Sequence, residues 1–140
     1  MTNDAALAAV SSGFFGSVGF DLVDVRRFAH LTAVGGPRFL NRQFTPLEID
    51  TCGGDSERLA ARFAAKEAVA KSLGTGFRDG LAARHIEIVT CPTGCPVVVL
   101  NGPAVAAAAA TGRDHFAVSL SHENGFAGAF VIAYSNKEAL

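Results

Sequence analysis

The stretch that decides the fold is RFAAKEAVAKSLGTG, residues 62–76. It is built from strong helix formers and continues a helical pattern that begins at Ser56. The glycines of Gly74-Thr75-Gly76 end that pattern. We therefore predict a long helix over 56–73, in which four apolar side chains share much of one face: Leu59, Phe63, Val69 and Leu73.

The residues before this helix predict a strand and two shorter helices. Residues 14–25 are rich in β-branched and aromatic side chains, and we expect the strand to end near Asp21. A short helix over 25–34 should stop at Gly35-Gly36-Pro37. Thr45-Pro46-Leu47-Glu48 then opens another helix with a threonine cap, a first-turn proline and a glutamate three residues after the cap.

The residues after the long helix predict two hairpins separated by a helix. Residues 86–90 and 96–100 read as one hairpin and residues 103–110 as an alanine-rich helix. Residues 115–121 and 126–133 read as a closing hairpin, with its turn at 122–125. This order has no sustained alternation of strand and helix. It predicts a single small α+β domain with an antiparallel sheet, one long helix and shorter helices.

Composition restricts the function classes. The net charge is −1, from 12 basic and 13 acidic residues, so no overall attraction to nucleic acid or to an anionic membrane is expected. No segment approaches the roughly 20 apolar residues of a membrane span, and the first twelve residues do not resemble a signal peptide. Three cysteines in an apolar chain favour free thiols. We expect a soluble, cytoplasmic protein.

Two carboxylates are candidate metal ligands. Asp21 alone is more often a solvated or capping residue, but Mg²⁺ takes oxygen ligands and commonly needs only one or two protein carboxylates. Phe63, Glu67 and Lys71 are four residues apart and share a stripe of the long helix. From spacing alone, Glu67 and Lys71 read more readily as an ordinary surface pair.

Other motifs leave alternatives open. Gly74-Thr75-Gly76 can bring backbone N–H groups to an anion, yet a plain helix cap is the simpler interpretation. Strand alternation places Ser119 and Ser121 on one face and leaves His122 at the turn, which argues against a serine triad. We interpret Cys91 and Cys95 as structural or incidental thiols, because a metal site would need further ligands.

Taken together, these motifs resemble the holo-acyl-carrier-protein synthase family, the short trimeric class of phosphopantetheinyl transferases. The resemblance covers about residues 18–133, and its most specific block is the glutamate-bearing helix with its GTG tail. The other matching segments are GFDLVDVRRF at 19–28, FTPLEI at 44–49, GCPVVVLNG at 94–102 and VSLSHENGFAGAFVI at 118–132.

The resemblance implies an enzyme that transfers the 4′-phosphopantetheine of coenzyme A to a carrier-protein serine and releases 3′,5′-ADP, in support of fatty-acid or polyketide biosynthesis. It implies Mg²⁺ as the cofactor, with Asp21 and Glu67 as metal ligands and Lys71 as a further catalytic residue. By the same resemblance Arg62 and His122 would hold the 3′-phosphate end from an adjacent subunit of a homotrimer. The implied coenzyme A site consists of Arg62, Phe63, Lys71, Gly74, Thr75, Gly76, Pro96 and His122.

The implied partner is an acidic apo acyl carrier protein or carrier domain, which a basic face should bind. Four arginines early in the chain are candidates for it: Arg26, Arg27, Arg38 and Arg42. For Arg38 and Arg42 a solvated helix face is an equally good interpretation. We expect an N-terminal extension over 1–17, the transferase domain over 18–135 and a C-terminal tail over 136–140. The extension is longer than the family usually has, and it can be flexible, artificial or the remnant of a larger synthase.

Two alternatives compete with this interpretation. One is a non-catalytic coenzyme A or carrier-protein binding module of the same fold, against which the presence of Asp21, Glu67 and Lys71 argues. The other is a small thioesterase or dehydratase with one central helix, which needs no Mg²⁺.

The chain departs from the family pattern in one hairpin. Where the family commonly has a basic residue between the glycine and proline of its hairpin, this chain has Cys95.

Overall fold

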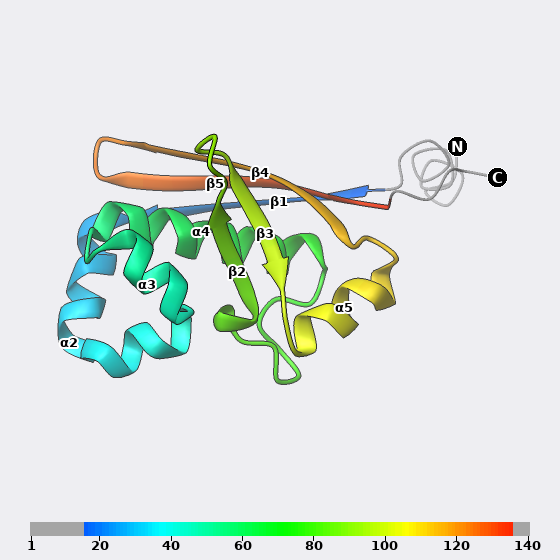
Figure 1. Cartoon of the computed structure of the whole chain (residues 1–140), viewed down its shortest axis with the longest axis horizontal. Coiled ribbons are helices and arrows are strands. Elements are labelled where there is room, and N and C mark those ends of the chain that lie inside the picture. Colours follow the sequence, from blue (N-terminus) through cyan, green and yellow to red (C-terminus); the bar gives the residue numbers. More distant parts are fainter. Residues whose placement is uncertain (1–15, 136–140) are drawn as a thin grey trace, which may run out of the picture.

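The structure is a computed structural model that describes residues 16–135 (Figure 1). The expectations for residues 1–15 of the extension and for the tail over 136–140 lie outside this range. In chain order the elements are β1 (Gly16–Asp24), α2 (Val25–Gln43), α3 (Pro46–Cys52), α4 (Ser56–Ser72), the short 3-10 helix η1 (Ala83–His85), β2 (Ile86–Thr90), β3 (Pro96–Leu100), α5 (Pro103–Thr111), β4 (His115–Glu123) and β5 (Phe126–Tyr134).

The strands form two antiparallel sheets, as the α+β prediction requires. The larger sheet has the order β1-β5-β4, so the last strand lies between the first strand and β4. Gly16 of β1 is opposite Tyr134 of β5, and Asp24 is opposite Phe126. The second sheet is the β2–β3 hairpin. Figure 1 shows the helices on one side of the three-stranded sheet, so that no element of residues 16–135 covers the other face of that sheet.

Helix α4 is the centre of the core. It is buried on most of its surface and packs against both β1 and β5. Small side chains allow this close packing, since α4 presents alanines to the sheet and β5 presents alanines and a valine to α4. At Gly19 the approach is so close that a Cβ would overlap the carbonyl oxygen of Ala68. The buried small residues of α4 and β5 include Ala60, Ala61, Ala64, Ala65, Ala68, Ala127, Ala129, Val131 and Ala133.

The outer face of the three-stranded sheet is apolar and exposed. Alternation along β1 turns Gly19, Asp21 and Val23 toward the helices and the intervening residues outward. Each of the outward side chains Val18, Phe20 and Leu22 is 57% exposed. Strand β5 adds further large apolar side chains to the outer face, namely Phe126, Phe130 and Tyr134.

Several local predictions are confirmed. Thr45 and Glu48 form a reciprocal capping box at α3, and Gly53 ends that helix in the left-handed conformation. The break near Gly35-Gly36-Pro37 is present as a kink at Gly36, although the helix resumes and continues to Gln43. The predicted hairpin over 86–100 and the alanine-rich helix are also present.

Two placements are wrong. Asp21 does not end its strand, because β1 continues for three further residues to Asp24, whose side chain caps α2. His122 is not in a turn either. The closing turn consists of Asn124 and Gly125 alone, both with positive φ, so that β4 extends through Glu123. A two-residue turn of this kind matches strand twist, which allows both strands to run on to it.

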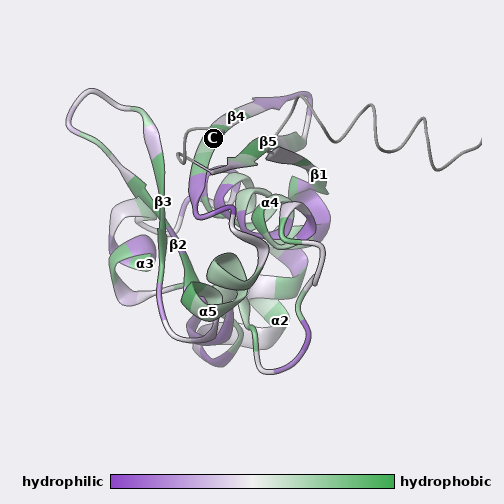
Figure 2. Ribbon diagram, turned by 90° about the vertical axis from the view of Figure 1, so that its right-hand side faces the viewer, coloured by the Kyte–Doolittle hydropathy of each residue, from purple (hydrophilic) through white to green (hydrophobic). Residues whose placement is uncertain are grey.

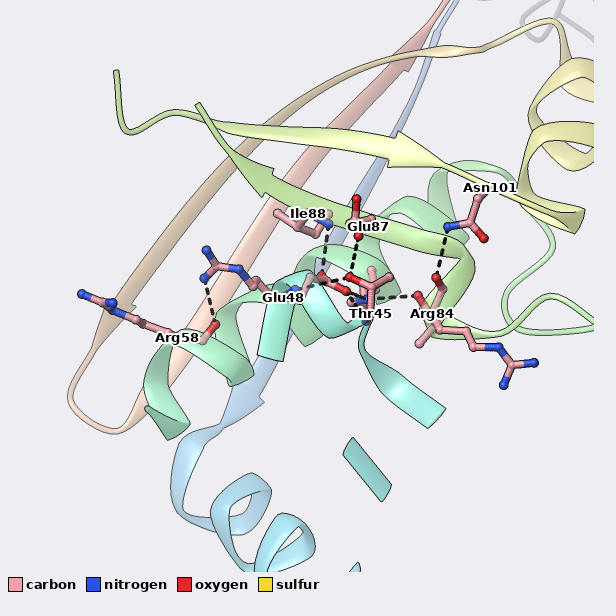
Figure 3. A network of polar contacts seen from close by, with 10 residues as sticks. Thr45, Glu48, Arg58, Arg84, Glu87, Ile88 and Asn101 are labelled. Carbon is pink, nitrogen blue, oxygen red and sulfur yellow. Dashed lines mark hydrogen bonds and ion pairs between the residues drawn. The ribbon is translucent and has the colours of Figure 1, made fainter. Parts of the chain in front are cut away.

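A buried ion pair joins three elements below the sheet. Lys66 of α4 lies 2.5 Å from Glu48 of α3, and both side chains have no exposed surface. The Lys66 ammonium also donates to the carbonyl of Ala83, and Glu48 accepts the backbone N–H of Ile88 in β2. Figure 3 shows Glu48 directed at Ile88, beside the Thr45 hydroxyl that donates to Glu87. The pair therefore fixes α3, α4 and the β2–β3 hairpin relative to one another.

Within residues 16–135, no helix combines the length and the apolar character needed to span a membrane.

Candidate functional site

Asp21, Glu67 and Lys71 meet at one groove beside α4. Strand β1 directs Asp21 toward the helix, and residues 67 and 71 lie one turn apart on the same stripe of α4. The groove has a volume of about 580 Å³, and Phe63 and Arg27 also line it. The expected convergence of an acid on β1 with an acid and a lysine on the long helix is therefore present in the structure.

Lys71 forms its ion pair with Asp21, in place of the surface pair with Glu67 that helical spacing alone favours. Its ammonium lies 2.9 Å from Asp21 Oδ1 and donates to the carbonyl of Phe20 at 3.0 Å. The Asp21 side chain is 18% exposed and the Lys71 side chain 52%. The Lys71 ammonium is thus already paired with one carboxylate of the site, and it remains exposed to solvent.

Glu67 has a raised pKa. Burial raises the pKa of Glu67 above its ordinary value, and the negative charge of Asp21 raises it further, while Lys71 partly offsets both effects. The two acids are therefore close enough to repel each other when both are ionised. A site that concentrates negative charge in this way favours a bound cation.

Glu67 and Phe63 also line a second groove on the other side of the stripe. This groove has a volume of about 390 Å³, and Arg42 and Arg84 contribute positive charge to its walls. Glu67 thus lies between a groove with Asp21 and Lys71 and a groove with two arginines. Arg84 was not predicted, and its place after a loop offers no sequence signal that would single it out.

The predicted nucleotide contacts do not all reach these grooves within one chain. Arg62 is buried and donates to the Thr90 hydroxyl of β2 at 2.8 Å. His122 Nδ1 lies 3.0 Å from Glu57 Oε1, in the first turn of α4. Residues 57 and 71 are separated by about 21 Å along the helix, at a rise of 1.5 Å per residue. Pro96 begins β3 and does not line either groove.

The GTG segment follows α4 directly, with Gly74 and Gly76 in the left-handed region. The Gly76 N–H donates to the Ala70 carbonyl, so the segment caps the helix, as the simpler interpretation expects. Thr75 Oγ1 is nevertheless buried without a hydrogen-bond partner, as is Arg62 Nε. Within residues 16–135 no other buried side-chain N or O atom is unsatisfied in this way. Both belong to residues that the resemblance assigns to coenzyme A.

The donor set suits a hard divalent cation with few protein ligands. No group of three or more His, Cys, Asp or Glu side chains in the described part of the chain could hold a metal ion. Asp21 and Glu67 together offer carboxylate oxygens, the ligands that Mg²⁺ prefers, and Mg²⁺ commonly leaves its remaining positions to water and substrate phosphate. The residues present therefore fit a Mg²⁺ site that substrate completes.

The four predicted docking arginines are all exposed and all lie on α2. Arg27 lines the groove of Asp21, and Arg42 lines the second groove. Arg26 and Arg38 line neither. The first turn of α2 has no acidic residue of its own, and the Asp24 carboxylate caps the helix at the Arg27 N–H.

The fold and the groove define a small α+β enzyme whose charged site lies between a buried central helix and the first strand. The sequence profile described as the 4′-phosphopantetheinyl transferase superfamily matches residues 17–135. The chain therefore belongs to this superfamily, and the predicted resemblance, fold and enzyme class are confirmed.

Three relatives illustrate the similarity. The holo-[acyl-carrier-protein] synthase of Desulforudis audaxviator is 46% identical over 125 residues, which cover 87% of this chain and 95% of the relative. The crystal structure of the synthase from Neisseria meningitidis has a TM-score of 0.76 at 36% identity and covers 85% of this chain and 98% of its own. The Helicobacter pylori synthase, crystallised in complex with coenzyme A, has a TM-score of 0.76 at 30% identity and covers 83% and 98%. The thioesterase or dehydratase alternative is wrong, because the chain matches the transferase superfamily and its described residues form four α-helices instead of one central helix.

Proposed function

We propose that this chain transfers the 4′-phosphopantetheine group of coenzyme A to a serine hydroxyl of an acyl carrier protein or carrier domain, with 3′,5′-ADP as the second product. The proposal includes Mg²⁺, with Asp21 and Glu67 as its protein ligands. The named activity of the relatives and the coenzyme A complex of the Helicobacter pylori synthase support the substrates. The observation that carries the proposal is the convergence of Asp21, Glu67 and Lys71 at one open groove.

The reaction exchanges one oxygen–phosphorus bond for another. The serine oxygen forms a bond to the β-phosphorus of coenzyme A, the bond from that phosphorus to the bridging oxygen breaks, and 3′,5′-ADP leaves. The serine proton passes to a carboxylate or to water. A bound Mg²⁺ would supply positive charge beside the pyrophosphate oxygens, as is usual in phosphoryl-type transfer.

The residues of the chain bind and orient the two substrates. Lys71 is held by Asp21 and the Phe20 carbonyl with about half of its side chain exposed, so its ammonium can contact a phosphate oxygen. Thr75 carries an unsatisfied hydroxyl between Gly74 and Gly76 and can contribute to the same phosphates. Phe63 lies one helical turn before Glu67 and supplies an apolar wall to both grooves.

We further propose that the complete site contains residues from two chains of a homotrimer. Arg62 lies about 14 Å from Lys71 along α4, and Glu57, which contacts His122, lies about 21 Å from Lys71 by the same rise per residue. One molecule of coenzyme A can contact both groups if a second chain supplies one of them. The exposed apolar face of β1 and β5 is of the kind that proteins bury between subunits, which supports the assembly.

The basic residues of α2 are the proposed docking site for the acidic carrier protein. Arg27 and Arg42 each line a groove that reaches Glu67, so a carrier bound over α2 would present its serine near the carboxylates. Arg26 and Arg38 would contribute longer-range attraction. An Arg27→Glu substitution should raise KM for the carrier about tenfold or more, and should raise it by a larger factor than KM for coenzyme A, whose groove Arg27 also lines.

Mass spectrometry of an apo carrier protein tests the central proposal. Incubation with the chain, coenzyme A and Mg²⁺ should add the mass of one phosphopantetheine, and Glu67→Ala or EDTA should abolish the gain. Asp50→Ala removes an exposed carboxylate that lines neither groove and should retain the activity. A full mass gain in the presence of EDTA would overturn the role of Mg²⁺.

A non-catalytic binding module remains the second candidate, because the same fold and grooves could bind coenzyme A without turnover. It predicts measurable binding of coenzyme A with no mass gain on any of several carriers.

The proposal also covers organisation and location. Residues 18–135 would be the transferase domain, in agreement with the extent of the family match. A cytoplasmic location would fit the three free thiols, since reducing compartments keep cysteines in that state.

A further inference from the structure

The tip of the β2–β3 hairpin brings two cysteines opposite each other. The Cys91 N–H donates to the Cys95 carbonyl at 2.8 Å, and the Gly94 N–H donates to the Cys91 carbonyl at 2.8 Å. Gly94 has a φ of 89°, a left-handed value that only glycine adopts easily. This is a three-residue turn with a glycine bulge, a common way to close a hairpin. Cys91 and Cys95 therefore continue the pairing register of the strands beyond Thr90 and Pro96.

The position of the pair permits a disulfide with little backbone movement. Directly opposed residues that share a backbone hydrogen bond have Cα atoms about 5.5 Å apart. Disulfides span about 4.4–6.8 Å between Cα atoms, so this separation lies within their range. Both thiols are free in the structure.

The surroundings of the two thiols differ. Cys95 is exposed, and its sulfur lies 3.3 Å from the Thr93 hydroxyl, whereas Cys91 is only partly exposed. The hydrogen bond from Thr93, followed by that from Cys91, lowers the pKa of the Cys95 thiol. The hydrogen bond with Cys95 raises the pKa of Cys91. Figure 2 shows the hairpin projecting from the body of the molecule, where a small reagent can approach it.

We propose that Cys91 and Cys95 form a redox-active dithiol that reacts with low-molecular-weight disulfides, with Cys95 as the attacking thiol and Cys91 as the resolving thiol. The proposal assigns a modification site outside both grooves, and it does not depend on the proposed transferase activity.

The reaction is two steps of thiol–disulfide exchange. The Cys95 thiolate attacks one sulfur of the small disulfide; that sulfur–sulfur bond breaks, a mixed disulfide forms on Cys95 and the first small thiolate leaves. Cys91 then loses its proton and attacks the Cys95 sulfur, which releases the second small thiolate and closes the 91–95 bond. The two cysteines lose two electrons and two protons, and the small disulfide gains both to become two thiols.

Incubation of the folded full-length chain with glutathione disulfide, followed by peptide mass mapping without reduction, tests the proposal. Cys91 and Cys95 fall in one tryptic peptide, residues 85–113, while the buried Cys52 falls in another and reports any unfolding. We expect the 85–113 peptide to lose two hydrogens and to carry no glutathione, and Cys52 to remain unmodified. Reduction with dithiothreitol should restore the original mass.

Single variants separate the two roles. Cys91→Ser should accumulate one glutathione on Cys95, because the second step is blocked. Cys95→Ser should react about tenfold more slowly, since the thiol with the raised pKa must then attack. Thr93→Val should slow disulfide formation severalfold and leave the final product unchanged. Stable glutathione adducts on both cysteines of the unsubstituted chain, or covalent dimers in place of the internal bond, would overturn the proposal.

Discussion

At the scale of single residues, Glu67 carries a cost in stability that its proposed role as a metal ligand would explain. The folded chain places this carboxylate in a partly buried position next to Asp21, and both effects raise its pKa. A group whose folded pKa is raised binds its proton more tightly in the folded state than in the unfolded state. Its contribution to stability is therefore present below the ordinary pKa of 4.5 and is lost as the pH rises through the folded pKa.

Glu67→Gln should consequently stabilise the metal-free protein while it abolishes the transferase activity. In EDTA near neutral pH we expect the melting temperature to rise by about 1–3 °C, because the substitution removes a repulsive charge. The difference should shrink as the pH falls toward 4.5. Melting curves of both proteins between neutral and acidic pH would measure it. A difference that grows on acidification would contradict the assigned direction of the pKa change.

The buried pair of Glu48 and Lys66 should be far more important for stability than the exposed pair at the groove. Burial lowers the pKa of Lys66, and Glu48 partly offsets that effect. Lys66→Met would leave the Glu48 carboxylate buried without its partner, which typically costs about 3–5 kcal/mol.

Lys71→Met is the matched control, since it breaks the half-exposed pair with Asp21 and should cost at most about 1 kcal/mol. Urea unfolding curves give both free energies. Equal losses of unfolding free energy in the two variants would show that burial of the Lys66–Glu48 pair does not govern its contribution to stability.

At the scale of elements, the contact between β1 and α4 depends on one glycine. Gly19→Ala would drive a methyl group into the Ala68 carbonyl, which belongs to the backbone and cannot rotate away. Overpacking of this kind should destabilise the fold by about 3 kcal/mol.

Gly128→Ala provides the comparison within the same sheet, because the nearest atom to its new Cβ is a Leu22 methyl carbon at 3.6 Å, an ordinary contact distance. We expect a change below about 1 kcal/mol for this variant. Thermal unfolding of the two proteins checks the contrast, and a Gly19→Ala protein as stable as the Gly128→Ala protein would refute the close approach.

Most elements could be predicted from sequence because their signals are local. The capping box at Thr45 and the proline and glycine breaks at residues 36, 37 and 53 act within a few residues. The predicted end of β1 near Asp21 is wrong because the strand stops only where Asp24 caps the next helix. His122 was misplaced because the tight Asn124-Gly125 turn needs only two residues.

The site was predictable only in part. The stripe of Phe63, Glu67 and Lys71 follows from helical spacing, yet the pairing of Lys71 with Asp21 depends on a strand 50 residues away. No periodicity encodes that contact. The position of Arg84 at the second groove likewise depends on tertiary packing.

At the scale of the whole molecule, the uncovered face of the larger sheet should control assembly. Phe20 and Phe130 are 57% and 44% exposed on this face. If subunits bury it, Phe130→Asp should convert the oligomer to monomer and lower the melting temperature, which should also lose its dependence on protein concentration.

Light scattering on a sizing column measures the mass directly. Val34→Asp is a suitable control, because Val34 is a 74% exposed apolar residue of α2 outside the sheet. Retention of the unsubstituted mass by Phe130→Asp would exclude this face as the subunit contact.

The pairing of β1 with β5 has a consequence for how the chain acquires its structure. Gly16 pairs with Tyr134, so β1, which is synthesised first among the strands of residues 16–135, must wait for β5, the last of them, before it gains a neighbour in the sheet. Contacts this distant in sequence slow folding, because a long loop must close before they form. During synthesis β1 therefore presents both an unpaired edge and the row Val18, Phe20 and Leu22, which are features that molecular chaperones bind and that promote aggregation of nascent chains. Helix α4 is synthesised well before β5, and β1 can pack against it until β5 has been translated.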